Sequence, residues 1–248
     1  MTINLRKSAP ATLAAATTIL AGLSLTGRPA TAQTSEVQQR LTEVKEASAQ
    51  NKQALATYTW QEQDTISLKG EVKKQESFQV HMGPDGKPQK TPLNAEPAAQ
   101  PSQAHSGRRG GRLKEKVVEN KKEEYKEYAQ KIGALAHSYV PPDKAKLQQA
   151  FQQGNVKLNA GATAGQVQLL ITNYVKPNDS MTITFDKAAK AIQSVQIASY
   201  MDSPSDVVRI AVHFAKLADG TNHIATMTVE GVSKQLKVAV ENSNYKKM

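Results

Sequence analysis

Alternating apolar and polar residues in the last third of the chain constrain the fold more than any other feature. Apolar side chains alternate with polar ones over 167–173, 181–185 and 208–214, and turn sequences such as Ala218-Asp219-Gly220-Thr221 separate these runs. Alternation places the apolar side chains of a strand on one face of a sheet. Strands at roughly ten-residue spacing are typical of an antiparallel meander. We therefore expect six or so strands from residue 156 onward, the last of them over 235–240.

An amphipathic helix is predicted well ahead of this meander. Val37, Leu41 and Val44 fall at helical spacing, and the pattern continues more weakly to the end of the segment 36–56. Ser35 has the residue type of an N-cap, with Gln38 three residues later completing a capping box. We therefore expect a helix over 36–56 that begins at Ser35.

A β-hairpin is predicted directly after the helix. Apolar and aromatic residues alternate over 57–68 and over about 72–82, and Lys69-Gly70 forms a turn between the two strands. Glu62 and Asp64 interrupt the apolar face of the first strand. We therefore expect that strand to be half open to water.

The middle of the chain divides into a loop and a helical insertion. Ala, Pro, Gln, Ser, Gly and Arg dominate residues 94–112 without an apolar period, which is typical of a flexible loop. Helical spacing then covers 113–153, interrupted by Pro141-Pro142. The predicted fold class is α+β: a curved antiparallel sheet, or half barrel, with the N-terminal helix and this insertion on its concave side. We expect one domain over 33–248.

Residues 1–32 have the layout of a secretory signal peptide. Arg6 and Lys7 precede an apolar run over 11–25, and small residues follow at Ala30-Thr31-Ala32. The apolar run is too short to span a bilayer comfortably. We predict cleavage near Ala32 and a periplasmic or secreted protein. Removing 1–32 takes away three of the 32 basic residues and none of the 22 acidic ones, which leaves a net charge of about +7.

Little in the sequence predicts catalysis. The chain has no cysteine, and none of its five histidines lies at metal-ligand spacing from another. No serine-nucleophile motif and no phosphate-binding glycine loop occurs. The histidines are expected at the surface or at sheet edges. We expect a monomeric, non-enzymatic protein without metal or cofactor, and export argues against nucleic acid as a partner. A hydrolase whose site is assembled from distant residues is the remaining alternative.

Several C-terminal segments resemble a known protein family. The segments are a strand that ends in an Asp turn, two further strands, a turn and the final stretch: 178–186, 192–197, 207–214, 217–221 and 242–245. They resemble the outer-membrane lipoprotein carriers of the LolA/LolB-like superfamily, which includes RseB-like lipid-sensing domains. The resemblance covers about 33–93 and 155–248. The Arg-Pro-containing strand of the carriers has no counterpart here, and 94–153 stands in its place.

The resemblance implies a half barrel whose apolar hollow holds acyl chains. We therefore expect a carrier or binding protein for lipid or lipoprotein acyl chains, and the alternative is an interaction or regulatory module without lipid cargo. The predicted lining of the concave face is Trp60, Phe78, Val80, Ile171, Phe185, Ile210, Val212 and Phe214. These residues could equally pack against the helix over 36–56, because alternation reports burial and not what causes it.

A basic segment lies between the predicted loop and the helical insertion. Its positive residues are Arg108, Arg109, Arg112, Lys114 and Lys116, with Glu115 as the one acidic residue among them. Such a segment can contact an anionic membrane surface. The alternative is a solvated loop that leads into a charged helix.

Overall fold

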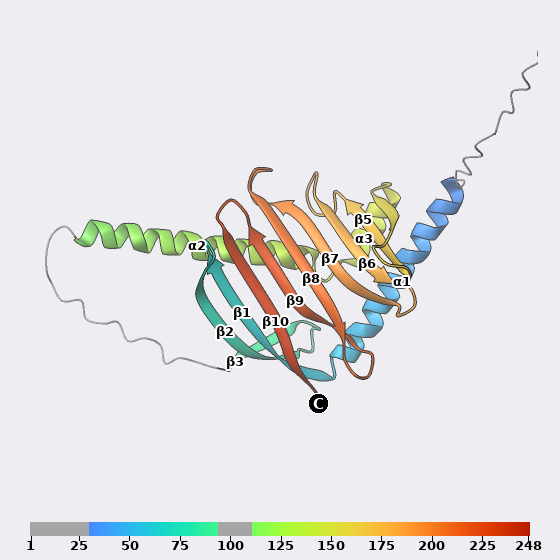
Figure 1. Cartoon of the computed structure of the whole chain (residues 1–248), viewed down its shortest axis with the longest axis horizontal. Coiled ribbons are helices and arrows are strands. Elements are labelled where there is room, and N and C mark those ends of the chain that lie inside the picture. The colour runs from blue at the N-terminus through green and yellow to red at the C-terminus, as the bar shows by residue number, and fades with distance from the viewer. Residues whose placement is uncertain (1–29, 94–110) are drawn as a thin grey trace, which may run out of the picture.

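The computed structural model describes residues 30–93 and 111–248, apart from the side chains of 30–33, 111–120 and 122. The described residues form an α+β fold with one open antiparallel sheet (Figure 1). The helices are α1 (Ala30–Leu55), α2 (Gly111–Tyr139) and α3 (Lys144–Gln152). The strands are β1 (Tyr58–Leu68), β2 (Glu71–Met82), β3 (Pro88–Pro92), β4 (Val156–Ala160), β5 (Gln166–Thr172), β6 (Ser180–Asp186), β7 (Ala191–Tyr200), β8 (Val207–Lys216), β9 (Asn222–Gly231) and β10 (Leu236–Lys247).

The ten strands form a meander of three strands and a meander of seven, which join where β1 pairs with β10. Their order is β3-β2-β1-β10-β9-β8-β7-β6-β5-β4, and β1 pairs antiparallel with β10. The sheet does not close, so β3 and β4 are its edges. β3 begins and ends with proline, which has no backbone N–H to donate and therefore limits further strand pairing at that edge.

One face of the sheet carries the helices, and we refer to it as the inner face and to the opposite one as the outer face. Figure 1 shows α2 running across the sheet behind the strands. Val37, Leu41 and Val44 of α1 share one core cluster with buried residues of α2, α3 and β5–β10. The predicted architecture, a curved sheet with helices packed on one side, is confirmed.

The hairpins at the β3 edge approach α1. A Cβ atom at Gly86, in the turn between β2 and β3, would lie 2.7 Å from the Lys52 ammonium nitrogen of α1. Gly86 also has a left-handed backbone (φ 70°), a conformation that glycine adopts without strain. The β2–β3 turn therefore reaches the C-terminal part of α1, across the inner face.

Asp179 fixes the loop between β5 and β6 to the end of α2. The Asp179 carboxylate is 1% exposed. It accepts hydrogen bonds from the backbone N–H groups of Tyr174 (2.6 Å), Val175 (2.8 Å) and Lys176 (2.7 Å) and from the Tyr139 hydroxyl (2.5 Å). Burial, reinforced by the bond to Asp179, raises the pKa of Tyr139 above its ordinary value. The buried charge is thus fully hydrogen-bonded, which is the condition for tolerating it in a core.

The structure corrects the predictions at three elements. α1 begins at Ala30, so Ser35 lies inside the helix and does not cap it. β3 was not predicted, because its sequence Pro-Gln-Lys-Thr-Pro has no apolar alternation. β10 continues to Lys247, beyond the predicted end near Val240, because its second half pairs with β1 alone. The seven strands that follow α3 form the antiparallel meander that the sequence predicts.

Two sequence predictions fall largely outside the described residues. The predicted signal peptide is described only from residue 30, where α1 begins. The predicted loop over 94–112 is described only at 111 and 112, which belong to the first turn of α2.

Replacing Asp179 by alanine should cost roughly 3–4 kcal/mol of unfolding free energy, because three backbone N–H groups and one hydroxyl would lose their buried acceptor. Urea unfolding of Asp179→Ala against the wild type measures this. The matched control is Asp202→Ala, in an exposed turn, which should stay within about 0.5 kcal/mol of the wild type. Equal stability of the two variants would contradict the assignment.

Candidate functional site

The eight predicted lining residues separate into two groups on the inner face. Ile171, Phe185, Ile210 and Val212 belong to the core cluster and are each at most 2% exposed, and Phe214 packs against that cluster. Side chains of α1 and α2 fill the space over this group. Trp60, Phe78 and Val80 lie outside the core cluster, on β1 and β2. The structure therefore does not bring all eight together in one hollow.

A polar corner of the inner face surrounds Trp60, where β1, β2, β3 and β10 adjoin. Glu62 and Asp64 share the face of Trp60, because residues two apart on a strand point to the same side. Asn242 of β10 lies opposite Glu62, and Lys90 of β3 lies in the same row as Trp60 through Val80 of β2. We refer to Trp60, Glu62, Asp64, Lys90 and Asn242 as the corner site.

The corner site is continuous with the apolar part of the inner face. Ile66 and Leu68 follow Asp64 on the same side of β1, and both pack against the core cluster. Val240 lies opposite Asp64 on β10 and is also buried. One surface thus changes from apolar to polar along β1 and β10.

The corner site contains three charged groups, of which Glu62 is buried and Asp64 and Lys90 are partly open to water. Glu62 is 7% exposed and forms an ion pair with Lys90, whose ammonium nitrogen also lies 3.3 Å from Asp64 Oδ2. Burial raises the pKa of Glu62. Burial works against the charged form of Lys90, but bonding and attraction from Glu62 and Asp64 raise its pKa overall. The Lys90 ammonium also lies 5.4 Å from the centre of the Phe78 ring.

Aromatic rings border the corner site. Trp60 stacks on Tyr245 with ring centroids 5.5 Å apart and an interplanar angle of 14°. His223 lies 4.2 Å from the Tyr245 ring and is 8% exposed. Asn244, with φ 54°, lies where the register of β10 shifts against β1. This irregularity sits next to Tyr245 and allows its ring to lie against Trp60.

The sequence indicates the corner site only in part. The strand that carries Glu62 was expected to be half open to water, and most residues of β1 are partly exposed, but Glu62 itself is buried by the strands and Lys90. The buried His223 likewise departs from the expectation of surface histidines. Lys90 sits on the unpredicted β3, and Asn242 lies past the predicted end of the last strand. Two carboxylates on an otherwise apolar strand face were the available signal.

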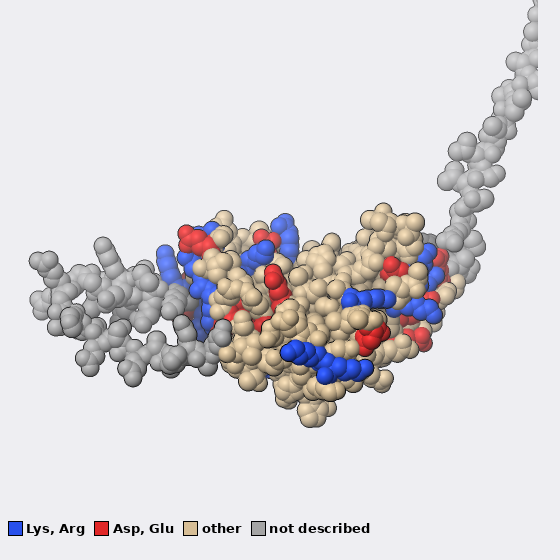
Figure 2. All heavy atoms as spheres, turned by 60° about the horizontal axis from the view of Figure 1, so that its bottom comes forward, with Lys and Arg blue, Asp and Glu red and all other residues tan. Residues whose placement is uncertain are grey.

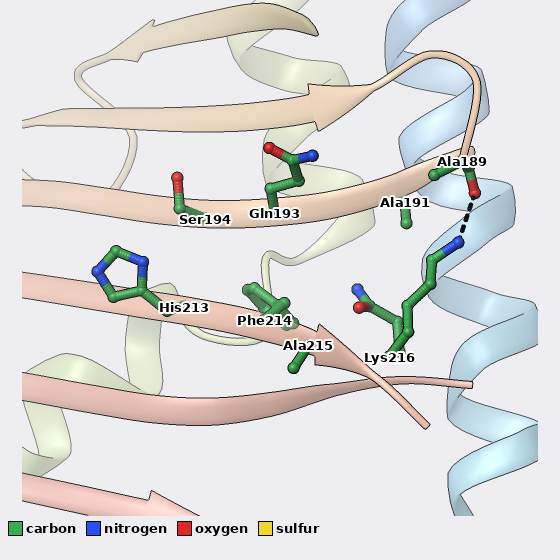
Figure 3. Close-up of a pocket in the computed structure, with 9 residues that line it drawn as sticks. Ala189, Ala191, Gln193, Ser194, His213, Phe214, Ala215 and Lys216 are labelled. Carbon is green, nitrogen blue, oxygen red and sulfur yellow. Dashed lines mark hydrogen bonds between the residues drawn. The ribbon is translucent and has the colours of Figure 1, made fainter. Parts of the chain in front are cut away.

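A shallow hollow of about 470 Å³ lies on the outer face between β7 and β8 (Figure 3). Its lining is Ala189, Ala191, Gln193, Ser194, His213, Phe214, Ala215, Lys216 and Asn222. Ser194 lies opposite His213 in the strand register. No hydrogen bond joins these two side chains, and no carboxylate lines the hollow. The hollow therefore does not present the linked nucleophile, base and carboxylate of a serine hydrolase.

The described residues contain neither a cluster of metal ligands nor a helix suited to cross a membrane. No three His, Cys, Asp or Glu side chains within 30–93 and 111–248 are grouped to hold a metal ion. Among the helices of these ranges, none combines the length and the apolar character needed to cross a membrane.

The predicted anionic-surface residues fall mostly outside the description. Arg108 and Arg109 lie outside the described residues, and Arg112, Lys114 and Lys116 lie in α2 with side chains that are not described. On the face shown in Figure 2, basic and acidic side chains lie beside one another.

Comparison with known proteins finds one structural similarity. No protein-family model and no curated protein matches the sequence. Among solved structures, the chain is similar to a DUF1329 family protein from Desulfovibrio piger, with 14% sequence identity and a TM-score of 0.45. The alignment covers 85% of this chain and 92% of that chain. A similarity of this size carries no argument about function.

The raised pKa of Glu62 predicts a pH dependence of stability with a definite sign. A folded-state pKa above the ordinary value of 4.5 means that protonated Glu62 is favoured in the fold. This stabilisation is complete below the unfolded pKa and is lost as the pH rises through the folded pKa. We therefore expect the wild type to lose stability relative to Glu62→Gln as the pH rises from about 4 to about 8.

Chemical unfolding across this pH range measures the difference. The comparison variant is Glu71→Gln, because the ion pair with Lys73 lowers the pKa of Glu71 and its contribution therefore has the opposite sign. A wild-type curve that stays parallel to that of Glu62→Gln at every pH would contradict the assignment.

Proposed function

We propose that the protein is a non-enzymatic, exported binding protein that carries an acyl chain of a lipid or lipoprotein on the inner face of its sheet. The acyl chain would lie beneath α1, in place of side chains that now cover the sheet. The resemblance to the lipoprotein carriers supports this assignment, because those proteins hold acyl chains in the hollow of a half barrel. The basic segment 108–116 is proposed to contact an anionic membrane surface during loading or release.

The observation that carries the proposal is the nature of the cover over the inner face. The apolar surface of β5–β8 is covered by separate helices and not by a second sheet. Three buried apolar side chains pack α1 against the sheet: Val37, Leu41 and Val44. Polar contacts include bonds from Lys45 to Gln148 and between Asn51 and the backbone of Asn222. The apolar part of this attachment is of a kind that an acyl chain can replace.

The free energy gained by burying the apolar side chains of α1 is similar to the free energy gained by burying an acyl chain. Burial of three aliphatic side chains contributes about 5–9 kcal/mol. An acyl chain that buries about ten methylene groups contributes roughly 8 kcal/mol. Because the two values are close, an acyl chain can displace α1 without making its own release prohibitively slow. That balance is what a carrier needs, since it must both load and unload.

A second function rests on the close packing of the same face. Ile171, Phe185 and Val212 are completely buried beneath the helices. A permanently filled interior would suit an interaction or regulatory module of the same fold that carries no lipid. The two functions differ in whether α1 leaves the sheet.

Native mass spectrometry of protein purified without detergent tests the proposal. We expect a fraction of the molecules to carry a co-purified lipid, and delipidated protein to take up a fluorescent acyl probe. A bare chain that also takes up no probe would contradict the carrier function and favour the filled module.

Weakening the attachment of α1 should make the inner face easier to load. Leu41→Ala is expected to lower the unfolding free energy by about 2–4 kcal/mol, because Leu41 is 1% exposed, and to increase acyl-probe uptake several-fold. Stopped-flow fluorescence and urea unfolding measure the two effects. The matched control is Gln50→Ala on the exposed side of α1, which should change neither. A variant with lower stability and unchanged probe uptake would contradict the proposal that an acyl chain displaces α1 from the inner face.

A further inference from the structure

Buried polar atoms without hydrogen-bond partners gather in the corner site. Among the described residues, five buried side-chain nitrogen or oxygen atoms lack a hydrogen-bond partner, and four of them belong to Trp60, Glu62, Asp64 and Asn242. Glu62 Oε1 faces the ammonium group of Lys90. The other three atoms are Trp60 Nε1, Asp64 Oδ1 and Asn242 Oδ1. Buried polar groups are almost always paired in folded proteins, so three in one corner require an explanation.

The three atoms define a recognisable hydrogen-bonding pattern. Trp60 Nε1 is a donor and needs an acceptor, whereas Asp64 Oδ1 and Asn242 Oδ1 are acceptors and need donors. A hydroxyl group both donates and accepts, so a ligand that carries hydroxyl groups suits the unpaired donor as well as the unpaired acceptors. A carboxylate only accepts and would add negative charge beside Glu62 and Asp64, which share a single ammonium group.

The position of the corner site suits the head of an amphiphile. Trp60 is 6% exposed, whereas Asp64 and Lys90 are partly open to water, so the site is partly enclosed. The apolar inner face begins directly beyond Asp64, at Ile66 and at the buried Val240. A ligand with an acyl tail over the sheet would place its polar end in the corner.

We propose that the corner site binds the hydroxylated head group of the lipid whose acyl chain the inner face carries. The preferred ligand class is therefore a neutral, hydroxyl-bearing acyl lipid such as a monoacylglycerol, in preference to a free fatty acid. This assignment rests on the proposed function, because it presumes that the acyl chain occupies the inner face.

Comparing two probes on the wild-type protein tests this preference. The probes are a 1-monoacylglycerol and a fatty acid of the same chain length, titrated at neutral pH as monomers below their micelle concentrations. Trp60 is the one tryptophan of the chain, so intrinsic fluorescence reports directly on the corner site. Two additional buried hydrogen bonds predict about tenfold tighter binding of the monoacylglycerol.

Variants of Asp64 assign the preference to the corner site. Asp64→Ala removes one of the two unpaired acceptors, and with it one of the two added hydrogen bonds, so the preference for the monoacylglycerol should fall from about tenfold to about threefold. Asp64→Asn retains a side-chain oxygen and should retain most of the preference. The matched control is Gln63→Ala, the next residue on β1, which faces the outer side and should behave as the wild type.

Each outcome decides between the two proposals. Binding of neither probe overturns the carrier function and this assignment with it. Equal binding of both probes supports the carrier function and overturns the head-group assignment alone. A preference that persists unchanged in Asp64→Ala also overturns the assignment. The comparison of the two probes on the wild-type protein needs no variant. It therefore tests the head-group assignment even if Asp64→Ala does not fold.

Discussion

The inner face of the sheet is apolar across β5–β8, and such a surface cannot remain exposed to water. The sheet is open and single, so no second sheet shields this face. Helices must do so, and α1 contributes three buried side chains. Three other features serve this requirement: the helix that precedes β1, the Asp179 bonds that fix the end of α2, and the approach of the β2–β3 turn to α1.

The inner face changes from apolar to polar along the sheet. This change predicts which end of the proposed ligand lies where. Over β5–β8 it is closely packed and apolar, whereas at β1 and β3 it carries Glu62, Asp64 and Lys90. Buried charge is costly unless it is paired, and here the pairing is incomplete at three polar atoms. An apolar surface that ends in an unsatisfied polar corner matches a ligand with an acyl tail and a hydroxylated head. Trp60, the single tryptophan of the chain, belongs to this polar corner.

The sequence predicted the architecture better than the site. Periodicity of two located nearly every strand, because half-buried strands must alternate, and helical spacing located α1 through Val37, Leu41 and Val44. β3 was not predicted, because all five of its residues are exposed and its sequence therefore has no alternation of apolar and polar residues. The corner site depends on contacts between β1, β3 and β10, which lie far apart in the sequence. Alternation could show that Trp60 and Val212 are buried, but not that different groups bury them.

The central claim is that α1 must leave the sheet for an acyl chain to enter. The Asn51 side chain bonds the backbone of Asn222 at 2.5 and 2.6 Å, so α1 and β9 are in contact there, and the chain has no cysteine of its own that would compete for a bridge between them. The decisive measurement is acyl-probe uptake by the Asn51→Cys, Asn222→Cys double variant, with bridge formation verified by loss of free thiols. The account predicts no uptake by the bridged protein and recovery on reduction. Equal uptake by both forms, or uptake by neither, would contradict it.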